Sequence, residues 1–316
     1  MTIGIDLEDR LAAYLELRRA LGTKMEADAG VLEDFVRFIR DRGATTSIAS
    51  TMVFDWLEER GKPGTRAAAR RLSSARQFLL YVSAALPDTQ VPELRLLAGY
   101  RRPTPFLFTS EEIEALLKCA AEFEPSRFSS VVVHTVLGLL TATGLRVSEA
   151  LGLDRLDVMP RNSPETLLIR EAKFHKSRIV PLHPTTAEQL RVYAGHRELM
   201  GYGLQTTAFF VSSHGRGLRY ETLRQRFRTL LDKAGVQPRE RCTKPTIHSL
   251  RHTFVASRLR RWHEEGVDVE RRLIHLATYV GHVDVRETYW YMTVTPELLT
   301  AATTDFQPPR LAGGEQ

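Results

Sequence analysis

The sequence from Tyr279 to Met292 is YVGHVDVRETYWYM, a Gly-His pair followed by three clustered aromatic residues. Gly281 is suited to end a helix, because glycine adopts the left-handed backbone conformation without a steric cost. We expect a short helix after it, on which Tyr289 and Tyr291 point to nearly opposite faces. Either the aromatic residues all pack in a core and His282 is an ordinary turn residue, or one tyrosine is a nucleophile with His282 beside it.

The composition limits the class of protein. The chain has 316 residues, 43% hydrophobic and 26% charged, which is ordinary for a soluble globular protein of two domains. Its net charge of +6 suits a nucleic acid or another anionic partner. Cys119 and Cys242 match no metal or redox spacing, which favours a reducing compartment. The N-terminus has no signal-peptide pattern, and the longest apolar run, Val131 to Leu145, is too short and too polar to span a bilayer. We therefore predict a cytoplasmic protein without a membrane partner.

Residues 1–100 have apolar side chains at helical spacing, which predicts an all-helical N-terminal domain. Glycines and a proline at residues 61–64 break the pattern, and a helix from Thr65 to Ala85 follows. The start of this helix is basic and has no acidic residue. Its candidates for contact with a DNA backbone are Lys62, Arg66, Arg70 and Arg71. The same charges could instead form a solvated helix face, although the mixed charges of the other helices here favour DNA.

The second half of the chain predicts a different domain. Prolines are frequent between residues 87 and 105, so we place a linker at residues 101–108 and a second domain at residues 109–316. Thr109 or Ser110 can cap its first helix. Residues 129–140 predict a buried apolar helix, and residues 166–170 and 178–182 predict a β-hairpin. The fold class is therefore mainly α with a small β-sheet, an α+β protein.

Several charged residues of this domain are candidates for an anion site. Arg146 follows the apolar helix, and Glu149 lies within reach three residues later. The pair could be a structural staple, or Glu149 could hold the arginine toward an anion. Lys173 and Lys176 lie on the hairpin connection, where they could be solvated or could enter a site as a proton donor or phosphate contact.

His248 and Arg251 are further candidates. They are three residues apart on a predicted helix that Thr246 can cap, so their side chains share one face near its N-terminus. They could form an ordinary polar helix start or belong to the same site.

Four stretches, taken together and in order, resemble the sequence boxes of the tyrosine recombinases, the phage integrase family. They are TGLRVSE (143–149), AKFHKSRIVPL (172–182), HSLRHTF (248–254) and GHVDVRETYWY (281–291). Each box alone is a weak signal, whereas the ordered set is specific, and the resemblance covers roughly residues 105–295. The helical N-terminal region is similar to the core-binding (SAM-like) domain of the family by position and character.

The resemblance implies a role for each matching residue. Arg146 and Arg251 resemble the two arginines that clamp the scissile phosphate, and Glu149 the acid that supports the first. Lys173 resembles the lysine of the hairpin, with Lys176 as the competing candidate, because glycines common in this box are missing here. The remaining matches are the two site histidines, His248 and His282, and the nucleophile, Tyr291, nine residues after His282. The spacing from Arg251 to Gly281 is longer than usual for the family, with an apparent insertion at Trp262 to Gly266.

The family resemblance implies a site-specific DNA recombinase, a DNA strand transferase that acts through a covalent 3′-phosphotyrosyl intermediate in the integration, excision or transposition of a mobile element. Its partner would be double-stranded DNA at the nucleoid, bound as a homotetramer or as a mixed tetramer with related recombinases. The segment after Thr295 would dock on a neighbouring subunit. The candidate residues include no carboxylate cluster for a metal and the chain has no Walker loop, so we predict neither metal nor cofactor. The alternatives are a nicking-closing enzyme like type IB topoisomerases and a non-catalytic DNA-binding accessory protein.

Overall fold

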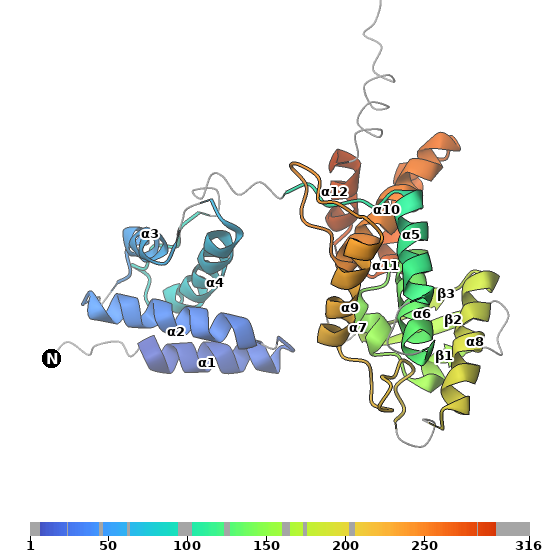
Figure 1. Ribbon diagram of the computed structural model, residues 1–316. Coiled ribbons are helices and arrows are strands. Elements are labelled where there is room, and N and C mark those ends of the chain that lie inside the picture. Colours follow the sequence, from blue (N-terminus) through green and yellow to red (C-terminus); the bar gives the residue numbers. More distant parts are fainter. Residues whose placement is uncertain are drawn as a thin grey trace, which may run out of the picture. The chain divides into compact units, whose positions relative to one another are not determined.

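The protein consists of two compact units, Met1–Arg102 and Pro103–Gln316. Figure 1 shows both in the computed structural model. The structure describes residues 7–23, 25–43, 47–61, 64–93, 103–122, 127–159, 165–172, 176–201, 206–282 and 284–294.

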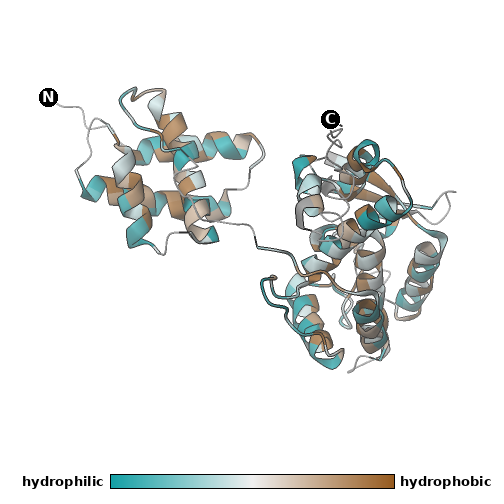
Figure 2. Cartoon of the chain, turned by 90° about the horizontal axis from the view of Figure 1, so that it is seen from above, coloured by the Kyte–Doolittle hydropathy of each residue, from teal (hydrophilic) through white to brown (hydrophobic). Residues whose placement is uncertain are grey.

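The described part of the first unit is helical. Its helices are α1 (Leu7–Ala20), α2 (Glu26–Asp41), α3 (Ser50–Glu59) and α4 (Arg66–Ser83). These helices have both hydrophobic and hydrophilic residues along their length (Figure 2), and their apolar side chains form one core that includes Phe35, Trp56 and Phe78. The helix predicted from Thr65 is α4, and the Thr65 side chain caps it by accepting a hydrogen bond from the Ala68 amide.

The second unit is mainly helical with a small sheet, which confirms the predicted fold class. Its helices are α5 (Ser110–Ala121), α6 (Arg127–Thr143), α7 (Val147–Leu151), α8 (Pro184–Leu199), α9 (Tyr220–Lys233), α10 (Ile247–Glu264), α11 (Val269–Val280) and α12 (Arg286–Val294), with a 3-10 helix at Arg155–Asp157. Thr109 caps α5 in a capping box with Glu112. Residues 103–108, expected in a linker, belong to this unit, because Phe106 and Phe108 are buried in its core.

The sheet has three antiparallel strands in the order β1-β2-β3. They are β1 (Val158–Met159), β2 (Thr166–Ala172) and β3 (Lys176–Pro181). The predicted hairpin is β2 and β3, in which Leu167 lies opposite Val180 and both side chains are buried. The two-residue strand β1 was not predicted, because it is too short to show an alternating pattern.

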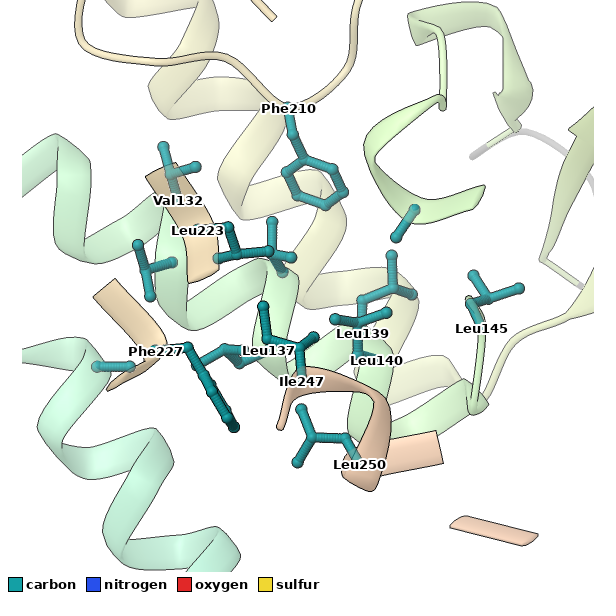
Figure 3. Close-up of a cluster of buried hydrophobic side chains, with 14 of the residues drawn as sticks. Val132, Leu137, Leu139, Leu140, Leu145, Phe210, Leu223, Phe227, Ile247 and Leu250 are labelled. Carbon is teal, nitrogen blue, oxygen red and sulfur yellow. The ribbon is translucent and has the colours of Figure 1, made fainter. Parts of the chain in front are cut away.

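Helix α6 is the central element of the second unit. It packs against α5, α7, α8 and α10. Figure 3 shows four of its buried side chains, Val132, Leu137, Leu139 and Leu140, in a cluster with side chains of α9 and α10. Most of its side chains are buried, as predicted, because neighbours cover several of its sides, whereas one side with His134 and Thr141 is only partly buried. It ends at Thr143, directly before the predicted anion site. No helix in the described ranges is both long and apolar enough to cross a membrane.

Candidate active site

A buried carboxylate joins two arginines from different elements. Arg146 is the N-cap residue of α7, and its Nη1 donates to Glu149 Oε1 over 3.0 Å. Arg178 of β3 donates to both carboxylate oxygens of Glu149, over 2.9 and 2.8 Å. Burial of the Glu149 carboxyl raises its pKa, but the hydrogen bonds and charges of Arg178 and Arg146 outweigh burial and keep the pKa below its usual value. Glu149 therefore stays ionised and fixes the position of both guanidinium groups.

The same two arginines hold the C-terminal end of α11. Arg146 Nη2 donates to the Gly281 carbonyl over 2.7 Å, and Arg178 Nε donates to the Tyr279 carbonyl over 3.0 Å. Gly281 has a φ of 71°, and a Cβ there would lie 2.6 Å from Arg178 Nη1. The position requires glycine for both reasons, which agrees with its prediction as a helix stop. The turn that leads to His282 is thus attached to the arginines by hydrogen bonds.

Arg251 lies deep in the same region. It is on the first turns of α10, is 2% exposed, and its Nη1 donates to the Gly144 carbonyl over 2.7 Å. Burial and the charge of Arg146 lower the pKa of Arg251 to about 10, which leaves the group charged at neutral pH. Its Nη2 has no hydrogen-bond partner among the described residues. A buried guanidinium N–H is costly to leave without a partner, and an anion is a strong acceptor for it.

Tyr291 lies on α12 and faces the N-terminal half of α10. The phenol is 2% exposed, whereas Tyr289, two residues earlier, is 43% exposed. The predicted opposite orientation of the two tyrosines is confirmed. A hydrogen bond of 2.6 Å joins Tyr291 Oη to Nδ1 of His252. The hydroxyl is therefore directed at α10 rather than into solvent.

His282 lies beside the same phenol. Its ring is stacked on that of Tyr291 at a centroid distance of 6.3 Å and an interplanar angle of 13°. Its Nδ1 is 2.7 Å from the hydroxyl of Thr288, which is fully buried on α12. The Gly-His turn and the tyrosine helix therefore hold each other in place.

The structure describes some of the remaining predicted site residues and not others. His248 is exposed on the first turn of α10, with its ring 4.6 Å from that of His252. Lys176 begins β3, and Lys173 lies outside the described residues. The choice between the two lysines stays a prediction.

Apart from Lys176 on β3, the basic residues predicted to contact DNA lie on α4 of the first unit, except Lys62, which is outside the described residues. Arg66 and Arg70 are exposed, and Arg70 Nη2 donates to Asp28 Oδ1 over 3.2 Å. Arg71 is partly buried and donates to the Arg60 carbonyl over 2.9 Å. Two of the three described candidates therefore make contacts within their own unit.

The apparent insertion at Trp262 to Gly266 spans the end of α10 at Glu264 and the turn after it, where Gly266 has a φ of 67°. The Trp262 side chain packs on the small core that also contains Tyr291. His248 and Arg251 lie at the opposite end of the same helix, on its first turns.

Two residues of this site were missed in the sequence. Arg178 is the arginine of the pattern K-x-R-x-V-P-L. The alternation of side chains along β3 does not indicate that Arg178 reaches Glu149, 29 residues away. His252 follows Arg251 in the stretch HSLRHTF, but its partner Tyr291 is 39 residues away. Among the described residues, no three His, Cys, Asp or Glu side chains lie together as ligands of a metal ion.

Comparisons with known proteins identify the family of the chain. Residues 107–297 match the phage integrase family. The protein y4rB of Sinorhizobium fredii NGR234, named as an integrase/recombinase, is 34% identical over 92% of this chain and 93% of its own length. The tyrosine recombinase XerD of Oceanobacillus iheyensis is 28% identical over 88% of this chain and 89% of its own length.

A solved structure has the same fold. It is that of a lambda integrase tetramer bound to a Holliday junction, with a TM-score of 0.60 and 17% identity over 89% of this chain and 78% of that one. The family match covers more than half of the chain, and the relatives span nearly all of it. This chain therefore belongs to the phage integrase family of tyrosine recombinases, enzymes that cut and rejoin DNA strands.

Proposed function

We propose that this protein is a site-specific recombinase that cuts and rejoins double-stranded DNA through a covalent 3′-phosphotyrosyl intermediate on Tyr291. The observation that supports this most is the unused Nη2 of Arg251, buried beside the charge of Arg146 and the phenol of Tyr291. A DNA phosphate is an anion that would complete this arrangement.

The chemistry follows from the positions of the groups. Arg146 and Arg251 would neutralise the non-bridging oxygens of the phosphate, where charge develops during the attack. The Tyr291 oxygen forms a bond to phosphorus, and the bond from phosphorus to the 5′ oxygen breaks. Lys173, or Lys176 in its place, would give a proton to the departing oxygen. The phosphotyrosyl bond keeps the energy of the phosphodiester, so the reverse reaction can join a new strand without a cofactor.

The first unit would bind the DNA beside the site through the exposed start of α4. Arg66 and Arg70 are four residues apart on one face there, and Ser73 is exposed one turn later. Arg70 is 53% exposed at its side chain although it contacts Asp28, so that surface pair costs little to exchange for a phosphate.

We further propose that the protein acts on two paired sites as a tetramer, of its own copies or with related recombinases, for the integration, excision or transposition of a mobile element. The tetrameric state of the lambda integrase structure and the integrase/recombinase name of y4rB support this. Such a DNA substrate would place the enzyme at the nucleoid in the cytoplasm. The segment after Thr295 lies outside the described residues, and we propose that it docks on a neighbouring subunit.

Covalent trapping tests the nucleophile. Wild type, Tyr291→Phe and Tyr289→Phe are incubated with nicked duplexes drawn from the DNA that flanks the native gene, and denaturing gels separate protein-linked strands. We expect a protease-sensitive adduct with wild type and Tyr289→Phe, and none with Tyr291→Phe. Tyr289 is the matched control, because it is the same residue type on the same helix but exposed. An adduct that persists in Tyr291→Phe would refute the assignment.

A further inference from the structure

We propose that His252 is a catalytic residue, the group that accepts the proton of Tyr291 as the tyrosine oxygen attacks the phosphate. The inference rests on the proposed role of Tyr291 as nucleophile and adds a residue outside the set predicted from the sequence.

The geometry of the pair suits a proton transfer. His252 Nδ1 lies 2.6 Å from Tyr291 Oη, at the short end of the distance over which a general base takes a proton. The two rings are 5.5 Å apart between centroids, with an angle of 47° between their planes. His252 directly follows Arg251 on α10. The base and the phosphate-binding group are therefore supported by the same rigid helical turn.

Neighbouring aromatic rings hold His252 in this orientation. The Trp290 ring meets it nearly edge-on at 6.1 Å, and the His248 ring does so at 4.6 Å. Trp290 in turn contacts Tyr291 at 5.2 Å, so His252, Trp290 and Tyr291 form one packed group. A ring restrained in this way spends little entropy in reaching the geometry of the reaction.

Burial of Tyr291 favours a proton acceptor within the protein over one from solvent. The phenol is 2% exposed, so bulk water has little access to its proton. A free tyrosine has a pKa of about 10, so at neutral pH nearly all of it is the weakly nucleophilic phenol. A histidine, with an ordinary pKa of about 6.5, is the side chain best suited to take the proton near neutral pH. The group in hydrogen-bond contact with the phenol is a residue of that type.

The step balances as follows. Neutral His252, protonated on Nε2, accepts the phenolic proton at Nδ1 while the bond from Tyr291 Oη to phosphorus forms. The bond from phosphorus to the 5′ oxygen breaks, and that oxygen takes its proton from a separate donor, Lys173 or Lys176 in the proposed site. On rejoining, the imidazolium of His252 returns the proton to the Tyr291 oxygen. His252 and the lysine thus act on opposite ends of the same displacement.

The assignment distinguishes between the two histidines of the HSLRH segment. His252 is partly buried and faces Tyr291, whereas His248, one turn earlier, is exposed at the start of α10. We assign the proton of the nucleophile to His252, because His252 and not His248 is hydrogen-bonded to the phenol among the described contacts.

The test separates the two ends of the displacement with two nicked duplexes. One has the natural 5′ oxygen at the scissile bond, and the other has sulfur there, a leaving group that needs no proton donor. Single-turnover adduct formation is measured for wild type, His252→Asn, His252→Gln and Lys173→Ala. Asparagine can accept a hydrogen bond near the place of Nδ1 but cannot take up a proton. His263→Asn is the matched control, because His263 is an exposed histidine on the same helix.

We expect both His252 variants to lose on the order of 10²–10⁴-fold in rate on both duplexes. The sulfur duplex should restore the rate of adduct formation in Lys173→Ala but not in a His252 variant. Native gels should show unchanged DNA binding, which demonstrates that the variants are folded. Rates within about threefold of wild type, or a His252 defect that sulfur restores, would overturn the assignment. Failure of wild type to form any adduct would instead refute the proposed function, and this inference with it.

Discussion

Replacement of Arg178 by alanine should destabilise the second unit strongly, although Arg178 is not among the residues expected to touch DNA. Its side chain is 12% exposed and that of its partner Glu149 is 5% exposed. The guanidinium donates two hydrogen bonds to Glu149 and others to the carbonyls of Tyr279 and Val280 at the end of α11. Alanine would remove all of these hydrogen bonds, and of its described hydrogen bonds Glu149 would keep only those from Arg146.

The magnitude follows from burial of the pair. Removal of one partner from a buried ion pair costs ~3–5 kcal/mol, because the remaining charge stays out of water. Arg146 still faces Glu149 over 3.0 Å, so part of the charge remains compensated and we expect a loss in the lower half of this range, ~3–4 kcal/mol. For a unit of about 200 residues, such a loss lowers the melting temperature by roughly 6–16 °C.

Calorimetry of the full chain measures this effect. The transition of the second unit should move to lower temperature, and that of the first unit, which does not contain Arg178, should stay in place. Arg224→Ala is the control, because the Arg224–Glu221 pair is exposed and should contribute no more than ~1 kcal/mol. If Arg178→Ala destabilises the second unit no more than Arg224→Ala does, the reasoning is refuted. The contacts of Arg178 would then contribute no more to stability than its contacts with water in the unfolded chain.

Three further predictions concern the same site. Gly281→Ala should cost ~1–3 kcal/mol in stability, because its φ is 71° and its Cβ would meet Arg178, and a thermal shift below 2 °C would contradict this. The pKa of Glu149 is lowered in the folded state, so its contribution to stability is present above its unfolded pKa and is lost as the pH falls through the folded value. Denaturant unfolding from pH 7 to pH 3 should therefore show a smaller loss of stability for Glu149→Gln than for wild type, and equal losses would contradict the shift. Arg251→Lys should slow single-turnover cleavage on the order of 10²–10³-fold, because lysine has no planar fork with which to donate to the Gly144 carbonyl and to a phosphate at once. A rate near that of wild type would argue against the phosphate contact.

The sequence predicted elements whose signals are local. The capping box at Thr109, the end of α11 at Gly281 and the amphipathic α4 each depend on residues within a few positions of one another. The opposite orientations of Tyr289 and Tyr291 follow from helical spacing alone. Such features could be predicted because neighbours in sequence decide them.

The parts that were missed depend on contacts between distant residues. Arg178 reaches Glu149 and the end of α11, which lie 29 and about 100 residues away, and no local pattern specifies either contact. For His252, the partner could not be known until α12 was placed against α10. Phe106 and Phe108, assigned to a linker because prolines surround them, are buried because α9 and α10 offer them a core. Tertiary packing decided all three.

The hydrogen bonds of Glu149 imply that charge and position in this site are not independent. Glu149 orients Arg146, a proposed phosphate ligand, and Arg178, and both arginines hold the end of α11 just before the turn to His282 and Tyr291. Loss of the carboxylate would therefore disturb the phosphate clamp and the support of the nucleophile together. The effects of Glu149→Gln and Arg178→Ala on cleavage should accordingly be less than additive in the double variant, because the first change already removes what the second would remove. Full additivity would mean that the clamp and the nucleophile are positioned separately, and that the shared carboxylate serves only the stability of the fold.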